Sequence, residues 1–387
     1  MKSEWAIKKI SEIAEINPRE SIKKGIVAKK IPMDVLQPFT RDVPSFQYEV
    51  FKGGTKFRNK DTIMARITPC LENGKIAQIG CLDPGEVGFG STEYIVFRAR
   101  EGTDPDFLYY LIRSPLVREP SIKSMVGSSG RQRVQTNVVA DLQIAVPGIV
   151  EQKCIGDLLK VLDDKIQLNT KINKNLEAQA MALINDYCAS AIEKIALGKL
   201  MSFDNGYAFQ SKTYLSSGKY RIITIKNVLD GKIDSQGAAN INEIPTRMKS
   251  NCFLSKGDVL LSLTGNVGRV GIVYEDNLLL NQRVAKICPF NNALLPWLYY
   301  YFRLPSTKVS LETIAKGTAQ QNLSPVETLK LQIPFEMASA NNLSQVLLTM
   351  FNMEISNFIE SQQLSKLRDV LLPKLMSGEL DVSGIDL

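Results

Sequence analysis

A long internal repeat constrains the fold of this chain of 387 residues more than any other feature. Four sequence blocks occur twice, in the same order and at offsets close to 190 residues. Repeats of 20–50 residues are typical of solenoids, whereas one long period predicts a domain and its connector that occur twice. The matching blocks are 60–65 (KDTIMA) with 257–262 (GDVLLS), 107–115 (FLYYLIRSP) with 297–305 (WLYYYFRLP), 127–132 (GSSGRQ) with 317–322 (GTAQQN), and 142–147 (LQIAVP) with 329–334 (LKLQIP).

Both halves follow one internal plan. A strand-rich region comes first, because apolar runs such as residues 259–263 lie between glycine turns. A short aromatic helix follows over residues 105–113 or 296–303, and each opens at a proline, which is favoured in the first helical turn. We expect these helices to lie in the core rather than to stack on bases. A glycine-rich loop, a short strand and a proline then close each globular part.

A long helix is predicted after each closing proline. Residues at alternating spacings of four and three form a narrow seam, which is typical of a coiled coil. Asparagines on such a seam fix the register of a helix pair. The alternative is that each helix lies on the core of its own domain. The seam residues are Ile155, Leu159, Leu162, Ile166, Asn169, Asn173, Leu176, Ala180 and Leu183 in the first half, and Leu343, Val346, Met350, Met353, Asn357, Glu360, Leu364, Leu367 and Leu371 in the second.

Composition excludes several kinds of active site. The chain has no histidine, which removes Ser-His-Asp catalysis and every zinc site that contains histidine. None of the six cysteines belongs to a C-x-x-C pair, so we expect buried, reduced thiols. No phosphate-binding loop of the Walker type occurs. Residues 163–165 (DDK) have the spacing of a nuclease motif, but we interpret them as a solvated face of the first long helix.

The N-terminus lacks the apolar stretch of a signal peptide, and no apolar run approaches the ~18 residues of a membrane span. We therefore expect a cytoplasmic protein without a membrane partner. The net charge is +7, which permits a nucleic-acid partner without requiring one.

Eight short motifs are distributed over nearly the whole chain: 67–75 (ITPCLENGK), 88–94 (GFGSTEY), 130–134 (GRQRV), 147–152 (PGIVEQ), 205–209 (NGYAF), 225–227 (IKN), 257–260 (GDVL) and 264–268 (TGNVG). Together they resemble type I restriction–modification specificity subunits (S subunits). The segment after Pro147 contains the acidic residue and glutamine expected of this family, but Pro334 is followed by Phe335, Glu336 and Met337 instead.

The resemblance implies an α+β fold. Two similar globular target-recognition domains are separated by two long antiparallel coiled-coil helices, as a pseudo-two-fold internal repeat. The expected boundaries are 1–148 for the first domain, 149–190 for the first helix, 191–338 for the second domain, 339–378 for the second helix and 379–387 for a C-terminal tail. The isoleucines of residues 5–16 have near-helical spacing, and we expect this segment to pack near the C-terminal helix.

The resemblance also implies function. Each domain would read one half of a bipartite double-stranded DNA target. The helices would dock two methyltransferase subunits, and motor-nuclease (restriction) subunits would join that core. The chain itself would have no catalytic residue, metal or cofactor, because S-adenosylmethionine, ATP and Mg²⁺ would belong to the partner subunits. Two other interpretations stay open: a stand-alone DNA-modifying enzyme whose catalytic motifs have drifted, and a protein–protein scaffold.

Basic and amide side chains beside equivalent glycine loops are the candidate DNA contacts. Lys and Arg neutralise phosphates, and Arg, Asn and Gln can read base edges in the major groove. Any surface carries such residues, so their recurrence in both halves is what favours DNA binding. The first-domain candidates are Lys56, Arg58, Arg66, Thr68, Asn73, Lys75, Ser91, Thr92, Arg131, Gln132 and Arg133; the second-domain candidates are Lys212, Lys219, Arg221, Lys226, Thr264, Asn266, Arg269, Gln282, Arg283, Gln320 and Gln321.

Overall fold

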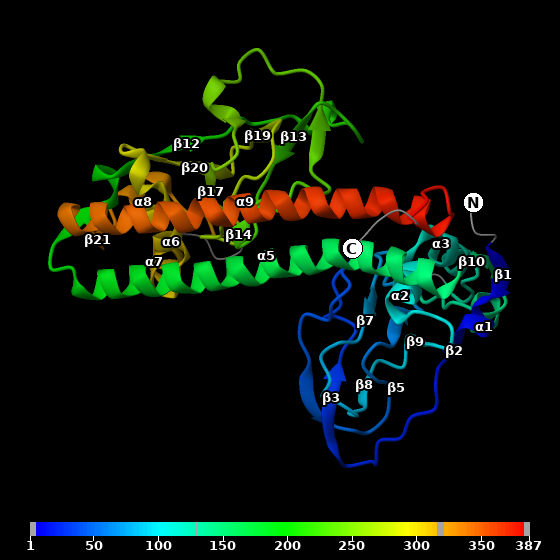
Figure 1. Cartoon of the computed structure of the whole chain (residues 1–387). Coiled ribbons are helices and arrows are strands. Elements are labelled where there is room, and N and C mark those ends of the chain that lie inside the picture. The colour runs from blue at the N-terminus through cyan, green and yellow to red at the C-terminus, as the bar shows by residue number, and fades with distance from the viewer. Residues whose placement is uncertain (1–4, 129, 316–320, 383–387) are drawn as a thin grey trace. The chain divides into compact units, whose positions relative to one another are not determined.

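The computed structural model describes residues 5–128, 130–315 and 321–382. The fold divides into two compact units, residues 1–167 with 362–387 and residues 168–361. Two long helices are each divided between the units: α5 (Ile149–Ser190) after residue 167 and α9 (Met337–Met376) after residue 361. Figure 1 follows the chain in colour from its blue N-terminal strand to the red end of α9.

The first unit contains two four-stranded sheets, with strand orders β2-β9-β6-β7 and β4-β3-β8-β5. All neighbours are antiparallel except β3 and β8, and β1 pairs separately with β10. The strands are β1 (Ala6–Lys9), β2 (Ala14–Ile16), β3 (Val27–Ile31), β4 (Gln47–Val50), β5 (Thr55–Phe57), β6 (Thr62–Ala65), β7 (Ile76–Gln78), β8 (Gly88–Gly90), β9 (Tyr94–Ala99) and β10 (Gln143–Val146). The helices besides α5 and α9 are α1 (Ile10–Ile13), α2 (Pro105–Arg113), α3 (Pro115–Lys123) and α4 (Thr136–Ala140).

The second unit has the corresponding sheets, with orders β12-β20-β17-β18-β14 and β15-β13-β19-β16, and β11 pairs with β21. Its strands are β11 (Lys194–Ala196), β12 (Met201–Asn205), β13 (Tyr220–Ile223), β14 (Gly231–Lys232), β15 (Ala239–Ile241), β16 (Phe253–Leu254), β17 (Val259–Ser262), β18 (Val270–Ile272), β19 (Leu278–Leu280), β20 (Val284–Pro289) and β21 (Gln332–Pro334). Its helices are α6 (Leu295–Arg303), α7 (Pro305–Ile314), α8 (Pro325–Leu329) and the short 3-10 turns η1 (Leu197–Lys199), η2 (Ser211–Thr213), η3 (Ser250–Cys252) and η4 (Asn292–Leu294).

Strand order and direction confirm the predicted duplication. β2, β9, β6 and β7 correspond to β12, β20, β17 and β18, and in the other sheet the parallel pair β3–β8 corresponds to β13–β19. The apolar blocks that revealed the repeat became β6 and β17. Both strands have neighbours on each side and are buried along their whole length, which explains their continuous apolar sequences.

The N-terminal segment fills the same place in the first unit that residues 194–205 fill in the second. β1 pairs with β10, Ile10 and Ile13 are buried, and Trp5 packs against the cluster that contains Leu375 at the end of α9. The expected packing near the C-terminal helix is therefore confirmed. The helical interpretation of the isoleucine spacing is wrong beyond α1, because backbone pairing with β10 and β9 makes the rest of the segment strand.

The aromatic helices lie in the core, as expected. In α2, the Asp104 carboxylate accepts a hydrogen bond from the Phe107 amide at 2.8 Å, and Pro105 occupies the first turn. Tyr109 and Tyr110 are fully buried. The corresponding Tyr299 and Tyr300 of α6 are no more than 1% exposed. These rings are among the largest buried side chains of each core, together with Trp297 in the second unit.

The long helices pair antiparallel within the second unit. Asn169 of α5 donates to Glu360 Oε2 at 2.7 Å, and Asn357 of α9 donates to Asn173 Oδ1 at 2.8 Å. Asn173 in turn donates to the carbonyl of Glu354 at 2.9 Å. Residues later in α5 contact residues earlier in α9, so the two helices run antiparallel within one chain. This confirms the predicted helix pair and the polar contacts expected of its asparagines.

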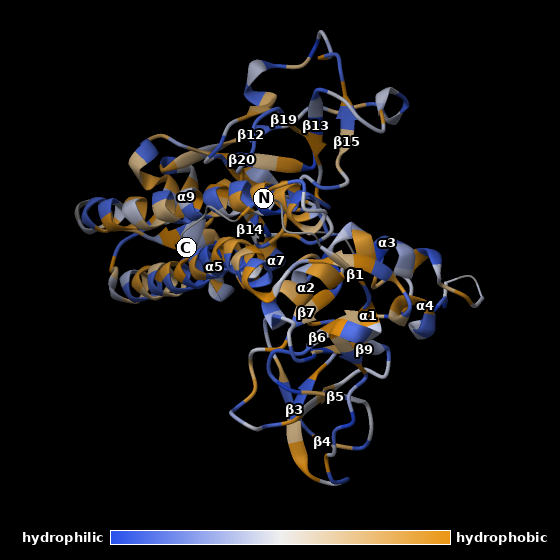
Figure 2. Ribbon diagram, turned by 45° about the vertical axis from the view of Figure 1, so that its right-hand side comes forward, coloured by the Kyte–Doolittle hydropathy of each residue, from blue (hydrophilic) through white to orange (hydrophobic). Residues whose placement is uncertain are grey.

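Four residues of the predicted seam lie outside it. They are 37–48% exposed, and the next residue along the chain is buried in each case. The exposed residues are Leu183, Val346, Met353 and Leu367, and the buried ones are Ile184, Leu347, Glu354 and Arg368. A strict 3.5-residue repeat drifts around an α-helix of 3.6 residues per turn. In addition, each helix buries a face against a globular domain as well as against its partner helix, so its buried stripe is wider than a coiled-coil seam. Figure 2 shows the resulting alternation of orange and blue along α5.

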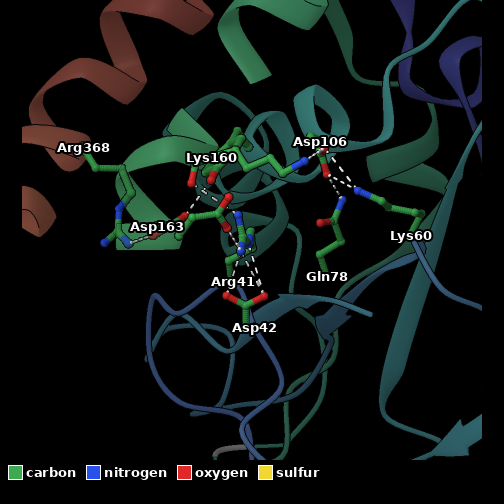
Figure 3. A network of polar contacts seen from close by, with 10 residues as sticks. Arg41, Asp42, Lys60, Gln78, Asp106, Lys160, Asp163 and Arg368 are labelled. Atoms are coloured by element: carbon green, nitrogen blue, oxygen red, sulfur yellow. Dashed lines mark hydrogen bonds and ion pairs between the residues drawn. The ribbon is translucent and has the colours of Figure 1, made fainter. Parts of the chain in front are cut away.

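A buried polar network joins the first domain to the helices, as Figure 3 shows. Asp163, 5% exposed, forms an ion pair with Arg368 of α9 and accepts a hydrogen bond from the Tyr110 hydroxyl at 2.7 Å. The interpretation of residues 163–165 as a solvated face is therefore wrong for Asp163. Heptad position had suggested exposure, but a buried arginine and tyrosine supply the partners that a buried carboxylate needs.

Further contacts of this network hold the loops of the first domain. Arg41, which is buried, donates to Asp164 of α5 at 2.6 Å. Asp106 at the start of α2 accepts hydrogen bonds from Lys60, Lys160 and Gln78 at 3.0, 3.1 and 2.8 Å. Burial alone raises the pKa of Asp106, but the hydrogen bonds from Lys60 and Gln78 outweigh it and the pKa is lowered.

The second unit repeats this attachment with different charges. The Tyr300 hydroxyl donates to Glu354 of α9 at 2.6 Å, as Tyr110 donates to Asp163 of α5. Arg303 of α6 pairs with Glu177 of α5 at 2.5 Å. No ion pair to a basic residue is seen for Glu354 within the described part of the chain, and burial raises its pKa to about 7. The same anchor thus contains a buried ion pair in one unit and a buried, proton-binding carboxyl group in the other.

Candidate nucleic-acid interface

Three loops meet at one end of the sheet β2-β9-β6-β7 in the first domain. The Arg66 amide, just after β6, donates to the carbonyl of Glu93 at 2.9 Å. The Thr68 amide donates to the carbonyl of Gln132 in the glycine loop at 3.1 Å. These bonds bring together seven residues, six of which are predicted DNA contacts: Arg66, Thr68, Ser91, Thr92, Gln132 and Arg133, with Glu93 as the seventh.

Glu93 organises the charges of this loop cluster. Its carboxylate accepts two or more hydrogen bonds from Arg133, with Nη2 to Oε1 at 2.7 Å and Nε to Oε2 at 2.9 Å. Arg66 Nε lies 3.9 Å from Oε2. The hydrogen bond from Arg133 lowers the pKa of Glu93, so the carboxylate is charged at neutral pH.

A hollow of about 480 Å³ lies beside this cluster. Lys56, Arg66 and Thr92 line it, together with Arg19 and the backbone at Gly54. Lys56 also lies 5.5 Å above the ring of Phe51. The hollow therefore presents three basic side chains at the surface where the glycine loop meets the sheet.

Four other first-domain candidates are not brought into this cluster by any described side-chain contact. Arg58 pairs with the buried Glu20 at 2.7 Å, and Lys75 donates to the carbonyl of Met33 at 2.8 Å. Asn73 lies exposed at the far end of the turn after β6, and Arg131 is exposed on the glycine loop.

The second domain builds the corresponding loop cluster. The Leu263 amide donates to the carbonyl of Arg283 at 3.1 Å, and the Gly265 amide donates to the carbonyl of Gln321 at 3.4 Å. Thr264 lies between these two bonds, while Asn266 is exposed on the turn that follows. Arg283 thus occupies the position that Glu93 has in the first domain.

A second hollow, of about 570 Å³, lies on this domain and is lined by Lys226, Gln282 and Arg283 among others. All three of these side chains are exposed. Asn281, which is buried, holds the loop by accepting a hydrogen bond from the Arg283 amide at 3.3 Å. Lys226, Gln282 and Arg283 were all predicted contacts, and the structure brings them to one surface.

The remaining second-domain candidates lie elsewhere. Arg221 forms an ion pair with Glu275 at 2.6 Å, and Lys219 lies over the ring of Tyr220 at 5.1 Å. Lys212 is exposed on η2 and Arg269 is half-buried before β18. Gln320 lies outside the described residues.

The backbone bonds also correct the alignment of the two glycine loops. Gln132 bonds to the amide of Thr68 as Gln321 bonds to the amide of Gly265, and Arg133 and Asn322 bridge to Ile67 and Thr264. The structural counterpart of Gln132 is therefore Gln321, not Asn322. A uniform offset of 190 residues misplaces the end of the loop by one residue.

The family model described as "Type I restriction modification DNA specificity domain" matches residues 2–178 and, a second time, residues 190–339. The two matches cover more than half of the chain. The chain belongs to this family. Its two matched segments are the two copies that the repeat and the strand orders define.

Two curated specificity subunits extend the comparison. The MjaIX type I restriction enzyme specificity subunit of Methanocaldococcus jannaschii is 22% identical over 99% of this chain and 95% of its own length. The EcoAI specificity subunit of Escherichia coli is 24% identical over 78% of this chain and 70% of its own length. A solved S subunit from M. genitalium has the same fold, with a TM-score of 0.57 and 16% identity over 97% of this chain and 96% of that one.

The specificity family recognises DNA and is non-catalytic. Within the described ranges, no group of three or more His, Cys, Asp or Glu residues could hold a metal ion, and no helix is long and apolar enough to cross a membrane. The six cysteines are unpaired, and burial raises the pKa of Cys188 and of Cys288 to about 11. The thiols of Cys188 and Cys288 are therefore protonated at neutral pH.

Glu93 is a residue of the loop cluster that the sequence patterns do not identify. It lies within a motif that resembles the family, but a pattern of basic and amide side chains does not indicate an acidic one. Its position in the sequence could have indicated it, because Glu93 directly follows the predicted contacts Ser91 and Thr92, as Arg283 directly follows Gln282. Asn17 and Arg19, which line the first hollow, were not among the predicted contacts; they directly follow β2.

Proposed function

We propose that this specificity subunit reads a bipartite DNA target, one half with each loop cluster. The observation that carries the proposal is the duplicated cluster itself, built by equivalent backbone bonds from Arg66 and Leu263 and furnished with basic and amide side chains. Such side chains contact phosphates and base edges. The two clusters share their backbone frame but not their side chains, so each half-site would have its own sequence.

Type I specificity subunits assemble with other subunits and DNA. We propose that the outward faces of α5 and α9 dock two methyltransferase subunits, and that restriction subunits join through that core. Large apolar residues are exposed on these faces, a property of protein interfaces. They include Val150, Val161, Leu168, Val346, Met353, Leu367 and Val370.

The chain would then be a non-catalytic subunit, and S-adenosylmethionine, ATP and Mg²⁺ would bind to its partners. Methyl transfer from S-adenosylmethionine by the purified chain alone would favour the alternative of a stand-alone enzyme. Failure to shift duplex DNA at two salt concentrations, alone and with methyltransferase subunits, would favour a protein–protein scaffold.

Selection of bound duplexes from a random library, with the chain in complex with methyltransferase subunits, tests the main proposal. We expect two short specified segments separated by an unspecified gap. A single continuous specified segment would contradict the assignment of one half-site to each domain.

A further inference from the structure

Arg66, Glu93 and Arg133, here termed the arginine–glutamate cluster, combine features that a phosphate site would not have. Lys and Arg contacts to phosphate depend on net positive charge. In this cluster the Glu93 carboxylate lies 2.7 Å from Arg133 Nη2 and offsets the charge of that side chain. A carboxylate also repels phosphate oxygens, whereas base edges carry no net charge.

The geometry of the Arg133 guanidinium leaves one edge free. A guanidinium has five N–H donors in a fixed plane, and Glu93 accepts from Nε and from one N–H of Nη2. One N–H of Nη1 and the second N–H of Nη2 form a two-donor edge directed away from Glu93. The Arg133 side chain is 45% exposed, so this edge is open to a ligand.

A two-donor edge of arginine matches the O6 and N7 acceptors of guanine in the major groove. Without Glu93, the exposed side chain would sample many rotamers and contact any phosphate within reach. With Glu93, the guanidinium is held in one plane before DNA binds, which lowers the entropy lost on contact.

We propose that Glu93 is a positioning residue that fixes Arg133 for bidentate contact with a guanine in the half-site of the first domain. This inference rests on the proposed DNA-reading function. It applies to the first domain only, because the second domain has Arg283 in place of Glu93 and Leu263 in place of Arg66.

The test uses the full chain in complex with methyltransferase subunits and duplexes selected from a random library. In the wild-type complex, 7-deazaguanine at one position of the first half-site removes the N7 acceptor and should weaken binding roughly 5- to 150-fold, the range of one bidentate contact. A phosphate contact would not respond to this change. It would respond to a neutral methylphosphonate linkage instead.

Glu93→Gln should lower the preference for that guanine at least about 5-fold. Its affinity for random duplex should stay the same or rise, with a salt slope steeper by about one, because a repulsive charge is gone. Arg133→Lys keeps the charge but loses the fork, and should lose the same guanine preference. Glu101→Gln, an exposed change of the same charge in the same domain, should alter neither.

Loss of the guanine preference at the first half-site, with affinity for random duplex not lowered, supports the inference, because a structural defect of the first domain would lower affinity for random duplex as well. Equal loss at both half-sites, insensitivity of wild type to 7-deazaguanine, or an unchanged preference in Glu93→Gln and Arg133→Lys would overturn it. If the wild-type complex selects no bipartite target, the proposed function fails; if it selects one without this guanine, only the role of Glu93 fails.

Discussion

Glu354 should make the second unit less stable as the pH rises. Its side chain is buried, 5% exposed, and its pKa is raised by burial from an ordinary value of 4.5 to about 7. A carboxyl group with a raised pKa binds a proton more tightly in the folded chain than in the unfolded chain. Stability is therefore lost as pH rises from about 4.5 through about 7.

The size of the effect follows from the shift. One pKa unit corresponds to about 1.4 kcal/mol, so the ionised form costs about 3 kcal/mol of unfolding free energy above pH 8. Glu354→Gln keeps a carbonyl that can accept the Tyr300 hydroxyl but cannot ionise. We expect this variant to be more stable than wild type by about 3 kcal/mol at pH 8.5 and by only about 1 kcal/mol at pH 5.5.

Tryptophan fluorescence can follow this unit alone, because the chain has two tryptophans and only Trp297 lies in the second unit. In a Trp5→Phe background, urea unfolding reports on the fully buried Trp297. Glu312→Gln, an exposed change of the same charge on α7, is the control and should change stability little at either pH. A Glu354→Gln variant that is no more stable at pH 8.5, or whose advantage does not depend on pH, would refute the reasoning.

Three other perturbations test other parts of the structure. Asp163→Asn leaves the buried Arg368 without its main partner, so calorimetry should show a loss of about 3 kcal/mol in the first unit, the opposite sign to Glu354→Gln. Replacing Arg131 and Arg133 together with Ala should relax only one half-site in duplex selection, and Arg283→Ala only the other; a change at both half-sites in either variant would contradict separate readers. Removing residues 1–16 deletes the buried Ile10 and Ile13 and should cost roughly 3–6 kcal/mol, so an unchanged melting temperature would be inconsistent with their role in the core.

The architecture could be predicted because its signals are local or repeated. The aromatic helices, the apolar strands β6 and β17 and the two long helices each have a characteristic spacing or composition, and each occurs twice. The helix spacing failed at Glu354 and Arg368. A heptad pattern treats charged residues as exposed, yet these side chains face partners from a globular domain or from the other helix. In the first unit, for example, Asp163 and Arg368 form an ion pair although they are far apart in the sequence, so local spacing cannot indicate that either is buried.

The charged surface could be predicted only in part, for a related reason. The sequence shows where basic residues are, but not which of them are already neutralised by a carboxylate. The charges of Arg58 and Arg221 are offset by Glu20 and Glu275, which lie 2.7 and 2.6 Å from them in the folded chain.

Glu93 is another carboxylate that folding brings beside an arginine, in this case Arg133. Equivalent backbone bonds put Glu93 in one domain and Arg283 in the other at one position of a shared frame. On the proposed function, a carboxylate at this position holds a neighbouring arginine in place, whereas an arginine at this position would itself donate to DNA. One substitution within the duplicated backbone frame would then replace a residue that positions a DNA contact by a residue that makes one.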